Sequence, residues 1–337
     1  MQHPTKFLFR VVAIILLYFV QQNNVMACDV CGCFIGVLPY DNQSSIGLMH
    51  RYRIFSGYPS LPGGSMFPSG AYRYANHSVL HGVTGVTLSP DDFESYKVIE
   101  LRGKLFIHPR IELNFLLPFS ENRLKSNSVT EKIDGLGDAT ILAGFHLINA
   151  KNDGEFRHRL VIGAGIKLPT GNYNSKSSNE IRNDIMIQNG TGSTDGIIYV
   201  AYTGGGHNFR WGTTLSGKIN STNKFDEQFS PSVSNTSFAG YLFSKGNLNV
   251  MPQVSVYQEA TKGLWVKNEL VEATAMRAVL LGPGIDVYYK NLSFSYGIQL
   301  PVYEKEFQSN LLNKGKMMVN LTWSFNQQKF LFHKKNV

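Results

Sequence analysis

The connections between the predicted strands of this chain alternate in length. Apolar and polar residues alternate over about twelve segments, and the links between these segments are short and long in turn. The short links are residues 108–110, 150–155, 204–208, 244–247 and 290–291. The long links are residues 56–94, 120–135, 170–195, 220–233, 258–276 and 302–315. This layout is typical of transmembrane barrels. It predicts an all-β, antiparallel up-and-down barrel in the bacterial outer membrane, with short periplasmic turns and long extracellular loops.

Alternation within the segments agrees with a barrel wall. In the last segment Met317, Val319 and Leu321 share one face, while Asn320 and Thr322 share the other. A transmembrane strand shows lipid one face and the lumen the other, so apolar residues recur at every second position. Each segment has about ten to fourteen residues, enough for the roughly 9–11 that a tilted strand needs to cross a bilayer. A soluble sandwich with one wet face also alternates, but it does not explain an apolar face that is aromatic near its ends.

Charged residues within the segments fall on the polar face. On the lipid face near the bilayer midplane, each would cost roughly 2–4 kcal/mol. We therefore expect them to line a narrow lumen, because twelve strands lie between the roughly eight that side chains fill and the roughly sixteen that leave an aqueous channel. The predicted lumen-lining residues are Arg51, Arg53, Glu100, Arg102, Lys104, Glu112, Asp138, Lys167, Lys218 and Asp286. Two prolines inside strands, Pro252 and Pro283, are predicted to mark β-bulges.

The start of the chain is predicted to be a signal peptide, residues 1–27. Lys6 and Arg10 form a positive start, and residues 11–20 form an apolar core too short to span a bilayer as a helix. Residues 25–27 suit the positions that a signal peptidase reads, which favours cleavage before Cys28; the alternative is an uncleaved amphipathic anchor. A periplasmic segment at residues 28–44, a barrel at residues 45–326 and a periplasmic tail at residues 327–337 are expected to follow.

Three cysteines, Cys28, Cys31 and Cys33, form a C-x-x-C-x-C pattern at the predicted mature N-terminus. A disulfide is the default state in the oxidising periplasm. Cys28 also resembles the lipidated residue of a lipoprotein, and acyl burial would then anchor the chain to a membrane. Three thiolates so close together could instead hold a soft metal such as copper or zinc. All three interpretations stay open, and no other cofactor is expected.

The composition limits the partners and the chemistry. Lys and Arg number 32 against 24 Asp and Glu, and this net charge of +8 favours anionic partners such as lipopolysaccharide, lipid head groups or an anionic solute. Basic residues alternate with acidic ones along the strands, so nucleic-acid binding is not expected. The sequence contains no G-x-S-x-G, H-E-x-x-H or P-loop motif. The chain is therefore not predicted to be an enzyme.

Three glycine-rich motifs carry a family resemblance. They are Gly-Leu-Gly-Asp at 135–138, Lys-Leu-Pro-Thr-Gly at 167–171 and Gly-Thr-Gly-Ser-Thr-Asp at 190–195. Their order resembles that of outer-membrane barrels labelled "meta-pathway of phenol degradation" transporters, and the cysteine-rich start resembles the Bacteroidetes-type members. The resemblance implies a barrel whose solute is unsettled. Asp138 and Lys167 lie on lumen-facing positions of neighbouring strands, so they could pair inside the pore or lie at a solvated loop edge.

We predict that the barrel passes a small solute across the outer membrane. Its expected partners are outer-membrane lipids, lipopolysaccharide, the solute and the barrel-assembly machinery, since the aromatic end of the last strand (residues 323–325) resembles the assembly signal. Two alternatives remain. One is a structural or binding barrel without transport, which could be linked to metal through the cysteines. The other is a lipid-acting outer-membrane enzyme.

Overall fold

The computed structural model describes residues 43–57, 89–126, 129–148, 156–177, 180–271, 276–306 and 311–325, and these residues form β-strands joined by turns and loops. In this part of the chain, no helix has the length and hydropathy needed to cross a membrane. The predicted signal peptide, the N-terminal cysteines and the C-terminal tail lie outside it. The strands are β1 (Ser44–Ser56), β2 (Phe93–His108), β3 (Ile111–Ser126), β4 (Val129–Leu136), β5 (Thr140–Ile148), β6 (Phe156–Lys167), β7 (Asp195–Gly206), β8 (Phe209–Ile219), β9 (Glu227–Phe229), β10 (Ser232–Tyr241), β11 (Phe243–Lys245), β12 (Leu248–Thr261), β13 (Leu264–Val266), β14 (Glu269–Val271), β15 (Met276–Tyr289), β16 (Leu292–Glu306) and β17 (Asn313–Phe325).

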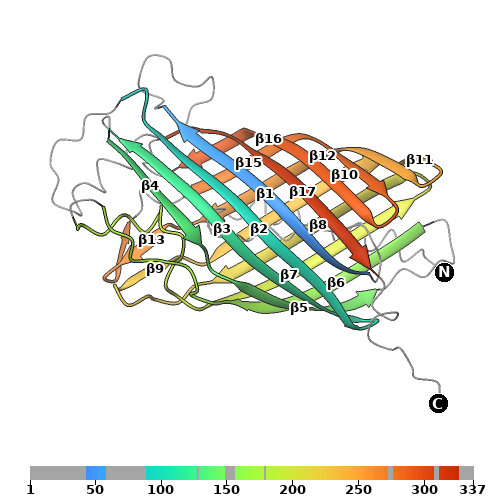
Figure 1. Cartoon of the computed structure of the whole chain (residues 1–337), viewed down its shortest axis with the longest axis horizontal. Coiled ribbons are helices and arrows are strands. Elements are labelled where there is room, and N and C mark those ends of the chain that lie inside the picture. Colours follow the sequence, from blue (N-terminus) through green and yellow to red (C-terminus); the bar gives the residue numbers. More distant parts are fainter. Residues whose placement is uncertain are drawn as a thin grey trace.

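The strands close into one antiparallel barrel with twelve strand positions around the ring (Figure 1). β4 and β5 together occupy one of these positions, because both pair with β3. β10 and β11 likewise occupy one position, because both pair with β12. The last strand, β17, pairs with β1 and closes the ring. A closed ring satisfies every strand edge internally, which is the condition for a β-structure to exist in hydrocarbon. The predicted barrel is confirmed.

Tight turns gather at one end of the ring. The hairpins β2–β3, β7–β8, β11–β12 and β15–β16 each turn through two residues. Left-handed backbone at His207, Gly246 and Lys290 suits the turns that match the twist of paired strands. The first and last described strand ends, Ser44 and Phe325, pair with each other at this end. By the layout of such barrels, this is the periplasmic end.

The prediction of a long loop at residues 120–135 is wrong. β3 continues to Ser126 and β4 begins at Val129, so the two strands form a hairpin that extends the wall outward. Its outward face carries charges that pair across strands: the Lys97 and Lys132 ammonium groups each lie 3.2 Å from a Glu121 oxygen. These charged residues are stable in a strand ladder that lies above the hydrocarbon.

The two strand prolines do not produce the predicted bulges. The pairing of β12 with β15 runs through Pro252 and Pro283 without a shift of register. The ladders on their other sides are interrupted instead, since proline has no N–H to donate. The bulge in this wall lies between Val279 and Leu280.

The outer surface of the barrel is apolar and its interior is polar. Large hydrophobic side chains are exposed on every second position, among them Ile46, Leu48, Phe115, Leu117, Ile162, Ile198, Val200, Phe294, Leu300 and Leu321. The opposite positions hold buried serine, threonine, asparagine and charged residues. Water would not support this inverted arrangement over so large an area, because contiguous apolar surface of this size marks a lipid or protein contact. The chain therefore has the surface of a membrane-embedded β-barrel.

One side of the lumen is filled. Leu116, Leu142, Val161, Ile197 and Tyr199 form a hydrophobic cluster between β3, β5, β6 and β7. The wall makes room for the Tyr199 ring by means of glycine: a Cβ at position 163 would lie 2.2 Å from a ring atom. The space that remains therefore lies toward the opposite wall, built from β1, β2, β12, β15, β16 and β17.

A small second sheet lies at the outer end. β9, β13 and β14 form three short antiparallel strands from two of the long loops, and Figure 1 shows β9 and β13 at the end away from the tight turns. Phe229 and Leu264 of this sheet pack against Ile185 and Met186 of a third loop. The long loops therefore have a hydrophobic core of their own.

We predict that a charge introduced on the outer face lowers the stability of the barrel more, the closer it lies to the bilayer midplane. Val200 lies midway along β7 and is 42% exposed, whereas Phe209 begins β8 at the tight-turn end and is 60% exposed. Val200→Arg should lower the free energy of unfolding by about 2–4 kcal/mol and Phe209→Arg by at most about 1 kcal/mol. Urea unfolding in lipid vesicles measures both; equal costs would contradict a hydrocarbon belt centred on these strands.

Candidate functional site

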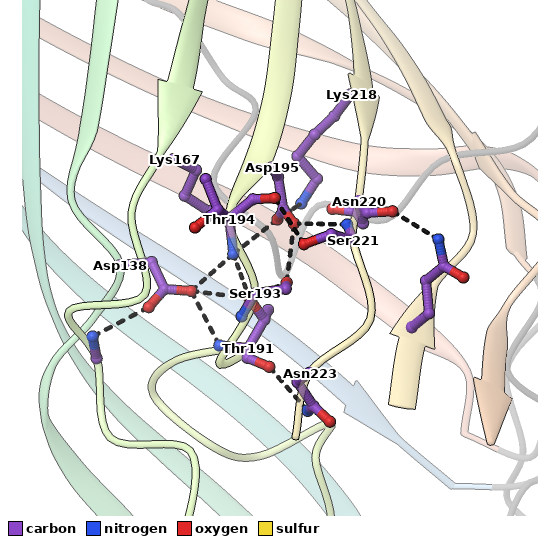
Figure 2. Close-up of polar contacts among 12 residues, drawn as sticks. Asp138, Lys167, Thr191, Ser193, Thr194, Asp195, Lys218, Asn220, Ser221 and Asn223 are labelled. Carbon is purple, nitrogen blue, oxygen red and sulfur yellow. Dashed lines mark hydrogen bonds and ion pairs between the residues drawn. The ribbon is translucent and has the colours of Figure 1, made fainter. Parts of the chain in front are cut away.

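The three glycine-rich motifs converge on one buried cluster of charges at the outer end of the lumen (Figure 2). Lys167, at the end of β6, lies 2.7 Å from Asp138 Oδ2 and 2.8 Å from Asp195 Oδ2. Lys218 of β8 lies 3.9 Å from the same Asp195 oxygen. The side chains of Lys167, Asp195 and Lys218 are at most 3% exposed. We call these four residues the ion cluster; it contains the Asp138–Lys167 pair that the sequence suggested.

Asp138 also holds the backbone of the long loop that follows β6. Its Oδ1 accepts a hydrogen bond of 3.0 Å from the Gly171 amide, and its Oδ2 accepts one of 2.9 Å from the Thr191 amide. Glycine is required where these segments touch. A Cβ at position 171 would lie 2.8 Å from Gly190 Cα, and one at position 190 would lie 2.6 Å from the Gly171 backbone. The motif glycines thus allow two loop strands to approach the carboxylate that binds both.

Asp195 connects the ion cluster to the next long loop. Its Oδ1 accepts hydrogen bonds from the Ser193 hydroxyl at 2.8 Å and from the Ser221 amide at 3.2 Å. Asn223 donates to the Thr191 carbonyl at 2.9 Å, as Figure 2 shows. Two carboxylates and two ammonium groups therefore hold two separate extracellular loops against the barrel wall.

The loop held by the ion cluster turns into the lumen. Asn122, a buried lumen residue of β3, donates to the Ile187 carbonyl at 2.9 Å and to the Gln188 carbonyl at 3.3 Å. The Gln188 side chain bonds Ser175 in turn, through Oε1 and Nε2. We call residues 184–190 the inward loop. It narrows the outer half of the lumen, and nothing in its sequence alone predicted this position.

A second network crosses the middle of the lumen. Glu100 accepts from Arg51 at 3.3 Å and from Arg102 at 2.5 Å. Arg53 pairs with Glu259 of β12, across the open side of the lumen. Because a buried carboxylate without a partner is costly, these pairs set the positions of the arginine side chains.

A third network lies on the filled side. Glu112 receives Lys104 at 3.5 Å and His146 Nε2 at 3.0 Å, and the Tyr199 hydroxyl donates to it at 3.4 Å. Asp286, on the other side of the barrel, accepts from the Tyr288 hydroxyl at 3.0 Å. The structure thus places all ten predicted lumen residues on inward positions, but it divides them among separate networks.

Two cavities lie in sequence along the open side of the lumen. The inner cavity, of about 150 Å³, has apolar side chains from Met49, Met251, Met318 and Phe238, and polar ones that include Arg102, Lys104 and Asp286. The outer cavity, of about 60 Å³, has Arg51, Arg53, Tyr96, Ser120, Asn122 and Lys316 in its wall and Gln188 and Asn189 of the inward loop beside them. Arg51 and Lys316 of the outer cavity are each two positions along their strands from Met49 and Met318 of the inner one.

Several important residues were missed from the sequence. Glu259 and Lys316 lie on the inward positions of β12 and β17. Glu259 falls inside the stretch interpreted as a long loop at residues 258–276, and Lys316 directly follows the one at residues 302–315. Asp195 was recognised only as the end of a motif. Extending the alternation by a few residues would have found all three. The inward loop had no such signal.

The N-terminal cysteines lie outside the described residues, so the metal and disulfide interpretations stay predictions. Within the described ranges, no group of three or more histidine, cysteine, aspartate or glutamate side chains could hold a metal ion.

A closed ring of strands with an apolar outer surface and a charged, partly open lumen is the architecture of an outer-membrane β-barrel. The profile of the family described as "Putative MetA-pathway of phenol degradation" matches residues 93–311, and the chain belongs to this family. Its fold is similar to that of an outer membrane channel from Pseudomonas putida F1, with a TM-score of 0.62 and 12% identity over 87% of this chain and 100% of that chain. The β-domain of the Bordetella autotransporter BrkA aligns with a TM-score of only 0.45 and 10% identity, over 85% of this chain and 100% of that chain. No curated protein matches the sequence.

We predict that the ion cluster holds the long loop in place. Lys167→Met leaves Asp138 and Asp195 facing each other in a buried site, and should cost about 3–5 kcal/mol of folding free energy. Proteases should then cleave within residues 171–194. Lys176→Met is the matched control, because Lys176 pairs with Glu180 at the exposed surface and should cost at most about 0.5 kcal/mol. Equal stability and equal protease resistance in both variants would rule out this role.

Proposed function

We propose that this protein is a channel that lets a small polar or amphipathic solute cross the outer membrane along one wall of its lumen. The observation that carries the proposal is the succession of two cavities beside the β1, β2, β12 and β15–β17 wall, while the β5–β7 side is filled. A structural barrel has no need for an open side.

The lining supports a small solute. The inner cavity combines three methionines and Phe238 with hydroxyl, amide and charged groups. Thioether side chains adapt to irregular apolar shapes, while the polar groups replace water around a solute's polar atoms. The cavity volumes suit a molecule of a few non-hydrogen atoms at each stage. The solved channel that resembles this fold supports the proposal by analogy of architecture only.

We propose that the barrel is not a lipid-acting enzyme. The acid–base pair of the described residues, Glu112 and His146, is buried on the lumen side, and His146 is fully shielded. A lipid-acting site needs its catalytic groups at the membrane-facing surface, where acyl chains are accessible.

The sequence supports further proposals about the family subtype, assembly, lipid contact and cysteine chemistry of this protein. The cysteine-rich start supports a Bacteroidetes-type member of the family, and the aromatic end of β17 supports recognition by the barrel-assembly machinery. The net charge supports contact with lipopolysaccharide. We propose disulfide formation, lipidation or binding of a soft metal at Cys28, Cys31 and Cys33. Serine at all three positions should change the metal content only if the last of these holds.

We predict that filling the inner cavity closes the channel. Gly297 of β16 faces the lumen beside this cavity, and a Cβ there would lie 3.8 Å from its nearest neighbour, so a larger side chain fits without strain on the wall. Gly297→Phe should reduce conductance in planar bilayers, or solute uptake in liposomes, by about tenfold, since the ring of Phe occupies much of a space of this size.

Gly196→Phe is the matched control. Gly196 of β7 faces outward, and a Cβ there would have no neighbour within 4 Å. It should fold and conduct like the unchanged protein. The channel proposal fails if folded wild-type barrels neither conduct nor pass solute, and the proposed path fails if both variants conduct equally.

A further inference from the structure

We propose that the outer cavity is a binding site for a small oxyanion, namely the carboxylate group of a permeating solute. This inference rests on the proposed channel function and specifies its substrate class. It would make the protein selective for small organic acids at the point where the inward loop narrows the lumen.

The wall of the outer cavity is positively charged. All the charged side chains that line it are cationic: Arg51, Arg53 and Lys316. Their carboxylate partners approach from outside the cavity. Glu100 meets Arg51 from the side that Arg102 also occupies, and Glu259 meets Arg53 from β12. The wall that a solute would touch is therefore positive, although each arginine already has one ionic partner.

Arg51 has a hydrogen-bond donor that is not used within the described part of the chain. Arg51 is only 8% exposed, yet its Nε is buried and donates to no group in the described part of the chain. Its Nη2 binds Glu100, so the guanidinium presents a donor beside a group that is already fixed in position. Buried donors without partners are rare, because such a group loses its hydrogen bonds to water and gains none in return. A ligand that accepts a hydrogen bond here would remove that cost.

The inward loop places a polar side chain, Asn189, at the outer cavity. Both amide atoms of Asn189 are buried at the cavity and have no hydrogen-bond partner among the described residues. Gly135 of β4 permits this position, since a Cβ there would lie 2.9 Å from Asn189 Nδ2. The cavity thus has, on its loop side, an amide group with unused hydrogen-bonding capacity, in addition to the guanidinium donor of its wall.

The size of the cavity selects the ligand. Its volume of about 60 Å³ compares with the roughly 10–15 Å³ of such space that one water molecule needs, so it holds a group of a few non-hydrogen atoms. A planar carboxylate matches the forked donors of arginine, and such charge-assisted hydrogen bonds are about twice as strong as neutral ones. The apolar remainder of a small organic acid could then extend toward the methionines of the inner cavity.

The test is an NMR saturation-transfer titration of the folded barrel in detergent at low salt, with acetate as the probe. Acetamide has the same shape without the charge, and inorganic phosphate distinguishes a general anion site from one that prefers carboxylates. Acetate should bind at least about tenfold more tightly than acetamide, and Arg51→Gln should weaken acetate binding by about tenfold. Heat-modified electrophoretic mobility verifies that each variant has folded.

Arg102→Gln is the matched control. It removes the same charge from the same partner, Glu100, but Arg102 lines the inner cavity. It should change acetate affinity by less than about threefold, well below the change expected where a direct charge-assisted contact is lost. Asn189→Asp provides a second variant that sacrifices no hydrogen bond of the described residues, and its negative charge should abolish binding.

The outcomes separate this inference from the channel proposal. Equal binding of acetate and acetamide, or equal losses in the Arg51 and Arg102 variants, overturns the anion site. Tighter binding of phosphate than of acetate overturns the assignment to carboxylates. Acetate binding by a barrel that does not conduct supports the site and rejects the channel, whereas conductance without acetate preference does the reverse.

Discussion

The contact between hydrocarbon and one face of every strand determines the rest of this structure. Because lipid excludes charge from the outside, charged side chains of the spanning strands lie inside, where each needs a partner. Glu100 meets this need with Arg51 and Arg102 on the β1–β2 wall, and Glu259 meets it with Arg53 across the open side of the lumen. The interior is therefore a set of ionic networks rather than a water-filled hole.

The same requirement explains how the extracellular loops are held. Asp138, Lys167, Asp195 and Lys218 lie where the wall ends, and their carboxylates bind loop backbone as well as ammonium groups. An inward loop fixed at this position reduces the lumen to a succession of small cavities. In the proposed channel, selectivity would therefore depend on a few side chains that line these cavities.

The two sides of the lumen differ in how tightly they are packed. Tyr199 and its apolar neighbours occupy one side, and glycine in the wall makes this packing feasible. On the other side, glycine and small polar residues leave space beside Met49 and Met318. A barrel of this size would otherwise be either closed by side chains or freely permeable, so the asymmetry is what permits a narrow route.

The sequence by itself determined the barrel, its strand faces and its inward charges, because a period of two in apolar residues reports directly on the hydrocarbon boundary. It also suggested the Asp138–Lys167 pair, since both residues lie on neighbouring inward positions. Only the tertiary structure decided that β3 and β4 extend where a loop was predicted, that Glu259 reaches Arg53, and that residues 184–190 enter the lumen. The last two outcomes depend on the folded ring, which brings together residues that are more than 60 positions apart and that no local pattern relates.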